Sequence, residues 1–184
     1  MTRRDAAAAG AAALFALAAA AAVYPEWRTA RAKRRLLEGE ALLIDASRQT
    51  NPAARDAVLR DATEVLEAVS PLLPYDVRPP YLLGSAALLG GRAAVALDHY
   101  RRSLAIEERP ETDMNLSRGY AAEGRPIPAS RDALRAVWLA PDLAKTLPPD
   151  TKKAVEDAIN RHAKRFAKGR TPVPPLFPEH PIGR

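Results

Sequence analysis

The amino-acid sequence predicts an all-α protein, in which a single N-terminal transmembrane helix is followed by a short α-solenoid of helical hairpins and a capping helix. Three observations lead to this prediction. Apolar residues recur at helical spacing, long stretches of alternating β-branched residues are missing, and one pattern repeats after 33 residues. The repeated positions are Leu83 with Leu116, Gly91 with Gly124, Ala96 with Ala129, and Tyr100 with Ala133.

The expected elements succeed one another in five segments. Their predicted boundaries are a transmembrane anchor or signal peptide at 1–24, amphipathic helices of a degenerate repeat at 25–76, two helical-hairpin repeats at 77–142, a capping helix at 150–169 and a proline-rich tail at 170–184. The part of the chain after the anchor has the length of one modest domain.

Within the first segment, the stretch Ala6–Val23 carries no charged or hydrogen-bonding side chain, and thirteen of its eighteen residues are alanine. As a helix it would reach about 27 Å, which is close to the thickness of a bilayer core. Tyr24 and Trp27 come next, where an interfacial aromatic belt is expected. We therefore predict an uncleaved signal anchor. The alternatives are a cleaved secretory signal, with Arg3 and Arg4 as its charged start, and an Ala-rich soluble helix.

Basic residues around the anchor allow two orientations. Five of them lie just after it at Arg28, Arg31, Lys33, Arg34 and Arg35, and by the positive-inside rule they favour a cytoplasmic C-terminal body. A chain that begins Met-Thr-Arg-Arg instead suits a signal anchor, which exports the C-terminal part of its chain. We favour export, and so expect a single-pass protein of a bacterial inner membrane with its repeats on the periplasmic side. The bacterial origin is a hypothesis from the excess of arginine over lysine and the abundant alanine.

Two amphipathic helices are expected between the anchor and the repeats, with a break at Ser47–Asn51 before Pro52. Each would bury an apolar stripe against a neighbouring helix. The stripe expected on the first helix consists of Leu36, Leu37, Ala41, Leu42 and Ile44. The stripe expected on the second consists of Val58, Leu59, Ala62, Val65, Leu66 and Val69.

The stretch from residue 77 to residue 110 contains a Leu-Gly pair, a glycine at an inter-helix turn, a small and an aromatic residue on the second helix, and a closing proline. These residues are Leu83-Gly84, Gly91, Ala96, Tyr100 and Pro110. On these residues the chain resembles a tetratricopeptide repeat (TPR), which implies helical hairpins that stack into a binding scaffold. Pro80 and Ser103 depart from the family pattern, which often has Trp and prefers Ala at these places.

A second copy of the pattern comes next. It matches at Leu116, Tyr120, Gly124, Ala136 and Pro141. It departs at Arg125-Pro-Ile-Pro128, because prolines inside a helix cost hydrogen bonds. We therefore expect the second helix of this copy to begin near Ser130, a suitable N-cap, and Ala129 to lie at the helix edge.

The capping helix is expected at Asp150–Gly169, where acidic residues come early, basic residues come late and a glycine ends the run. One face would seal the open end of the array. That face consists of Val155, Ala158, Ile159, His162 and Phe166. In the tail, Arg170–Arg184, five prolines favour an extended polyproline form that either docks a partner or lies along the protein itself.

Composition narrows the function classes. The absence of cysteine excludes disulfides, zinc fingers and thiol catalysis. The net charge of +6 is uneven, because residues 51–150 carry twelve basic and fourteen acidic groups whereas residues 151–184 carry eight and three. The basic face of the last helix is either solvated or meets anionic lipid or an acidic partner. Nucleic-acid binding is not expected, because no aromatic residues interleave with these charges.

Motifs that carry catalytic chemistry are missing, so we expect no enzyme, no catalytic residue, no metal and no cofactor. No nucleophile is placed to form a triad with His99, His162 or His180. No HExxH motif, glycine-rich phosphate loop or distinctive carboxylate pair occurs.

The resemblance to the TPR family implies that partner contacts lie on the inner face of the first helix in each repeat. The candidate partner-binding residues are Arg78, Tyr81, Ser85 and Leu88 in the first copy, and Met114, Asn115 and Arg118 in the second. A mixed surface of apolar residues and arginine suits a short helix or an extended peptide. The alternative for Leu88 is that it packs against the preceding unit.

The predicted function is a membrane-anchored TPR-like scaffold or adaptor, which binds a protein or peptide in the repeat groove and contacts lipid through its N-terminal helix. One alternative is an accessory subunit of a multi-subunit membrane complex, in which the Ala-rich helix packs against other membrane helices. Another is a soluble periplasmic repeat protein whose signal peptide is removed.

Overall fold

The computed structural model describes the backbone of residues 3–167 and the side chains of residues 24–161, 163 and 164. The described residues form helices and turns without any strand, which confirms the predicted all-α class. The α-helices are α1 (Arg3–Arg48), α2 (Pro52–Val69), α3 (Arg78–Leu89), α4 (Ala93–Ile106), α5 (Pro110–Ala122), α6 (Pro126–Leu139) and α7 (Pro149–Ala167). The 3-10 helices η1 (Ser70–Leu72) and η2 (Pro141–Thr146) precede α3 and α7.

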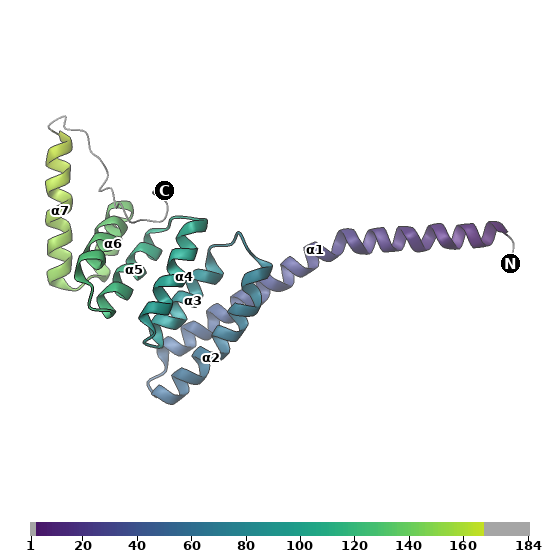
Figure 1. The fold of residues 1–184 in the computed structure, drawn as a ribbon, viewed down its shortest axis with the longest axis horizontal. Helices are drawn as coiled ribbons and strands as arrows, with labels where there is room; N and C mark the ends of the chain where they lie inside the picture. Colours follow the sequence, from purple (N-terminus) through teal and green to yellow (C-terminus); the bar gives the residue numbers. More distant parts are fainter. Residues whose placement is uncertain (1–2, 168–184) are drawn as a thin grey trace.

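The helices pair into hairpins that stack in chain order (Figure 1). α1 packs with α2, α3 with α4, and α5 with α6, and each hairpin contacts the next. The first helices of successive hairpins also touch, since α3 contacts both α1 and α5. Because each unit packs on its neighbours in the sequence, the arrangement is solenoid-like.

The 33-residue repeat is visible in the turns inside the hairpins α3–α4 and α5–α6. Gly91 and Gly124 have φ angles of 71° and 69°, a left-handed conformation that L-residues with a side chain rarely adopt. Each glycine ends its helix in a Schellman motif, which satisfies carbonyl groups of the last turn. The closing backbone hydrogen bonds run from Arg92 N–H to the Ala87 carbonyl at 2.8 Å and from Arg125 N–H to the Tyr120 carbonyl at 2.9 Å.

Tyr100 is fully buried at the centre of the hairpin α3–α4. Gly84 on α3 provides the space for its ring, because a Cβ at Gly84 would lie 2.6 Å from Cε1 of the tyrosine. The phenol donates a hydrogen bond to Ser85 Oγ at 3.3 Å. On the next turn of α4, the buried Ser103 hydroxyl donates to the Val77 carbonyl at 3.2 Å. Ser103 therefore ties α4 to the start of α3.

On α1 the buried stripe is rotated from the one expected. It consists of Ala32, Leu36, Gly39, Leu43 and Ala46. Leu37, Ala41 and Ile44 are exposed, so the expectation is wrong for these three residues. The cause is a close approach of α2, in which Leu66 packs on Gly39 and a Cβ there would lie 2.8 Å from the Leu66 Cδ2. This contact selects the Gly39 side of α1 for burial.

α6 begins at Pro126, so the expectation that it begins near Ser130 is wrong. Proline is tolerated in the first turn of a helix, because the N–H groups there have no intrahelical partner. Pro126 and Pro128 both lie in this turn. Ala129 is consequently inside the helix and buried, not at its edge.

The last helix packs against α6 and η2, and its Val155 is buried in their common core. The side chains of His162 and Phe166, the proline-rich tail at 170–184, and the side chains of the predicted anchor before Tyr24 lie outside the described residues. Within the part of the chain that is described, no helix is long and apolar enough to cross a membrane.

Candidate partner-binding site

Four of the predicted partner-binding residues come together where α3 and α5 touch. Asn115 Nδ2 donates a hydrogen bond to Tyr81 Oη at 3.0 Å, and Arg118 Nη1 donates to Asn115 Oδ1 at 2.8 Å. Ser85 Oγ donates to the Tyr81 carbonyl at 3.1 Å and accepts from the Tyr100 phenol. The bonds form a continuous polar network that crosses from α5 to α3.

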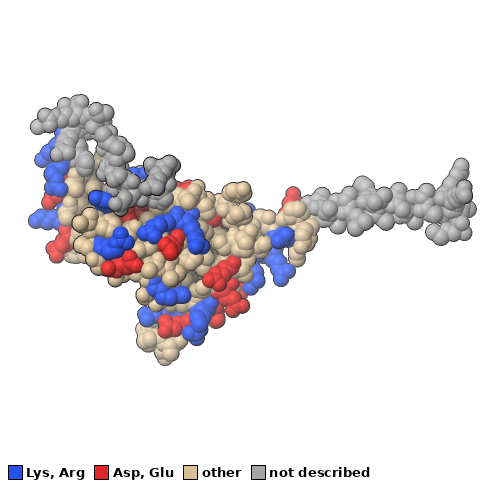
Figure 2. Space-filling model, in the orientation of Figure 1, with Lys and Arg blue, Asp and Glu red and all other residues tan. Residues whose placement is uncertain are grey.

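Arg118 is the charged residue of this network. Burial raises the pKa of Tyr81 and raises the pKa of Tyr100 to about 12, so both phenols stay neutral. Arg118 is exposed and makes no ion pair with a described residue. The hydrogen bond to Asn115 holds the guanidinium in place while its other N–H groups remain available to an anion. On the face of the molecule shown in Figure 2, basic and acidic side chains are interspersed.

The other three predicted residues lie apart from this network. Arg78 pairs with Asp76 through Nη2–Oδ2 at 2.5 Å and Nε–Oδ1 at 2.9 Å, and this hydrogen bonding lowers the pKa of the Asp76 carboxyl. Leu88 is half-buried against the core of the hairpin α3–α4. Met114 is buried in a core cluster with Ala133, because the small residue on α6 leaves space for its long side chain. The structure therefore does not place Met114 on the binding surface.

A groove lies beside Arg118, between α5, the start of α6 and the connection from η2 to α7. Its volume is about 490 Å³. It arises because α7 packs against α6 and η2 and does not continue the row of first helices formed by α1, α3 and α5 (Figure 1). Its apolar lining includes Ala121, Gly124, Pro126, Ala129, Leu147 and Pro148.

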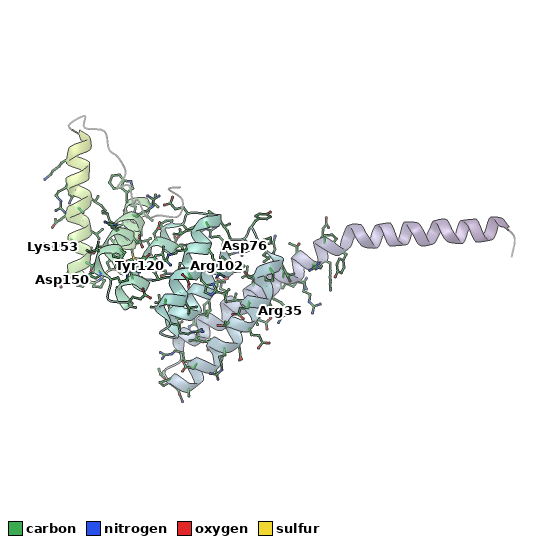
Figure 3. All side chains as sticks on the ribbon, viewed as in Figure 1. Arg35, Asp76, Arg102, Tyr120, Asp150 and Lys153 are labelled. Carbon is green, nitrogen blue, oxygen red and sulfur yellow. The ribbon has the colours of Figure 1, made fainter. Side chains whose placement is uncertain are left out.

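The groove continues as a second hollow between α6 and α7, with a volume of about 430 Å³. The two share Ser130 and Thr151. Arg131 and Asp150 also line the second hollow, and Figure 3 labels Asp150 at the start of α7. Together the two form a mainly apolar surface with a few polar groups, which is the usual composition of a ligand-binding site.

This groove is not predicted by the sequence, since its lining comes from segments that are remote along the chain. No pattern marks Ala121 as a contact residue, and Thr146–Pro149 belongs to no predicted element. The available signal is Leu147-Pro148-Pro149, because two consecutive prolines prevent a continuous helix from η2 into α7 and leave apolar groups at a bend.

Comparison of the chain with protein-family models, with curated proteins and with solved structures finds no match. The site is therefore defined by its own geometry: an apolar groove at the C-terminal end of a helical array, bordered by a positioned arginine.

Proposed function

We propose that the chain is a membrane-tethered, TPR-like scaffold that binds an extended apolar segment of a partner protein between α5, α6 and α7. The observation that carries this proposal is an apolar groove bordered by an exposed, hydrogen-bonded arginine. A bound segment would bury apolar side chains against Ala121 and Leu147, and a carboxylate of the same segment would accept hydrogen bonds from Arg118.

Two contributions would stabilise the complex. Burial of apolar surface contributes about 25 cal/mol per Å². A hydrogen bond to a charged group contributes roughly 1.5–3 kcal/mol, so loss of the Arg118–carboxylate contact corresponds to a tenfold or greater loss of affinity, by the order of magnitude of such bonds. The Tyr81–Asn115–Arg118 network lowers the entropy that Arg118 loses on binding.

The tether is supported by the composition of residues 6–23, which contain no charged side chain. A scaffold held near a membrane raises the local concentration of its partner there. We place the repeats on the periplasmic side of a bacterial inner membrane. Alkaline phosphatase fused after Arg170 is expected to be active, and a reporter that works only in the cytoplasm is expected to be inactive. The reverse pattern would place the repeats in the cytoplasm.

Selection of binding peptides tests the groove directly. The purified full chain is exposed to a displayed library of random peptides, and the enriched peptides are sequenced. We expect an extended motif with apolar residues and one acidic residue or a free C-terminal carboxylate. Arg118→Glu should abolish binding of the enriched peptides because it replaces attraction by repulsion, and Arg102→Glu, at an exposed arginine of α4, should leave it unchanged.

Two results would contradict this function. One is that no peptide family is enriched on the folded chain. The other is that the enriched peptides bind the Arg118→Glu and Arg102→Glu variants equally, because binding would then occur away from the groove.

A further inference from the structure

The stretch of α1 between Tyr24 and Arg31 presents two aromatic rings to solvent. Tyr24 and Trp27 are 56% and 54% exposed, and their ring centroids lie 6.4 Å apart. The guanidinium of Arg28 lies 5.6 Å from the Tyr24 ring centroid, and that of Arg31 lies 5.4 Å from the Trp27 ring centroid. Two exposed aromatic rings, each in contact with an arginine, therefore lie on the surface of α1, before the point where this helix packs against the rest of the protein.

A third aromatic residue joins them from a distant part of the sequence. Tyr75, in the connection between η1 and α3, is 91% exposed. Lys33 of α1 lines the same surface hollow as Leu72 and Tyr75. Figure 1 shows this connection beside α1, where α1 leaves the body, and Figure 3 labels Asp76 in the connection and Arg35 on the helix. The fold therefore places an exposed tyrosine next to the basic part of α1.

The charge of this part of α1 is strongly positive. Residues 24–35 contain five basic residues and a single acidic one, Glu26. None of the five forms an ion pair with a described residue. The nearby carboxylates of Asp76 and Glu107 form their ion pairs with Arg78, at the start of α3, and with Arg109. Figure 2 shows basic side chains on α1 where it leaves the body.

We propose that this surface, made of residues 24–35 of α1 and Leu72–Tyr75, rests on the anionic headgroups of a membrane and orients the solenoid against it. The positive charge of residues 24–35 favours contact with an anionic surface, and exposed Tyr and Trp side chains favour the membrane interface. Lys33 lies nine residues after Tyr24, about 13.5 Å along the helix, so a tilted α1 brings both ends of the surface to the headgroups. The inference rests on the proposed tether and is independent of the groove.

Fluorescence quenching at the headgroup level tests this contact. The full chain is reconstituted into phosphatidylcholine vesicles with or without phosphatidylglycerol, with a nitroxide label on the headgroup of a minor lipid. Trp27→Phe and Trp138→Phe remove both native tryptophans and keep an aromatic ring at each place. Tyr75→Trp then supplies the probe. Ile127→Trp, at a 68% exposed position of α6, is the matched control in the same background.

We expect quenching of the tryptophan at position 75 in the anionic vesicles, and loss of that quenching in neutral vesicles and at high salt, because salt screens exposed charges. The tryptophan at position 127 should not be quenched under any condition. Arg28→Gln with Arg31→Gln should reduce the quenching at position 75, and Arg102→Gln should not.

The proposal is overturned by equal quenching at positions 75 and 127, or by quenching at position 75 that depends on neither phosphatidylglycerol nor salt. A flotation assay distinguishes failure of the proposed tether from failure of the proposed lipid-facing surface. A chain that does not float with vesicles of either composition rejects the tether itself. A chain that floats with the vesicles, while position 75 stays unquenched, rejects only the lipid-facing surface and leaves the tether and the groove intact.

Discussion

The hairpins α3–α4 and α5–α6 share a turn and differ in what fills them. Both turns have a glycine with positive φ. Tyr100 fills the first hairpin under Gly84, whereas the residues 33 positions later are Ala133 and Ser117. In the second hairpin Met114 takes the space beside the small alanine. The repeat therefore preserves the backbone geometry of the turn, and the core residues adapt to one another within each hairpin.

The two hairpins also differ in what covers them. α3 lies between α1 and α5, but α5 borders the open groove on its far side. Leu88 and Ala121 occupy equivalent positions. Leu88 is half-buried in a core, and Ala121 is exposed in the groove. Equivalent positions thus pack inside the array and, at its end, form a surface that the described helices leave uncovered, which is why we place the binding site there.

The largest expected effect is on the core of the first hairpin. Tyr100→Ala should lower the free energy of unfolding by about 3–5 kcal/mol, because a buried aromatic side chain is lost and a cavity remains. Urea denaturation measures the change. Ile127→Ala, at an exposed position, should stay within about 0.5 kcal/mol of the parent chain. Equal effects of the two substitutions would contradict the central role of Tyr100.

Alkaline pH should affect the same hairpin. The pKa of Tyr100 in the folded chain is about 12, above the ordinary value of about 10. The folded state therefore holds this proton more tightly, and the resulting stability is present below pH of about 10 and is lost as pH rises through about 12. Unfolding free energies measured across this interval should fall less steeply for Tyr100→Phe than for the parent chain. Identical slopes would show that the phenol does not titrate with folding.

The shared turn predicts equal effects in the two hairpins. Gly91→Ala and Gly124→Ala should each cost about 1–2 kcal/mol, because an L-residue with a Cβ is strained at these φ angles. Gly90→Ala is the matched control, since Gly90 has φ of −81°. Thermal or urea unfolding of the three variants compares them. A neutral substitution at either positive-φ glycine would break the structural equivalence of the two copies.

Among these variants, Arg118→Ala is expected to have the smallest effect on stability and the largest effect on binding. Arg118→Ala should change the unfolding free energy by no more than about 0.5 kcal/mol, since the side chain is exposed. The same variant should lose most of its affinity for peptides selected on the groove, measured by titration calorimetry. A variant that unfolds readily would instead indicate that Arg118 supports the array.

Local signals predicted the repeat well. Gly91 and Gly124 marked the turns, because few other residues adopt positive φ. Ser47–Asn51 with Pro52 marked the break between two helices, and the structure shows that the Asn51 side chain there accepts hydrogen bonds from the N–H groups of Ala53 and Ala54. These features depend on neighbours in the chain, which are visible in the sequence.

Three features that depend on distant partners were not predicted. The exposed face of α1, with Leu37 and Ile44, is decided by the approach of Leu66 to Gly39. Met114 was expected on the surface, but it is buried because small residues of α6 leave space for its side chain. The groove is set by the direction in which α7 leaves η2, and no pattern within α5 or α7 reports that direction. Equivalent positions in a repeat therefore predict similar backbone conformations. Whether a side chain at such a position is buried depends on the unit that packs against it.

Site-specific photo-crosslinking at the equivalent positions 121 and 88 tests the central claim most directly. Benzoylphenylalanine is introduced at Ala121 or at Leu88 in the full chain, in the cells that produce it, and adducts are identified by mass spectrometry. We predict one discrete intermolecular adduct from position 121, with an apolar segment that carries a carboxylate, and its loss in Arg118→Glu. Position 88 should give crosslinks only within the chain. Intermolecular adducts from position 88 alone, or equal adducts from both positions, would contradict a binding site at the open end of the array.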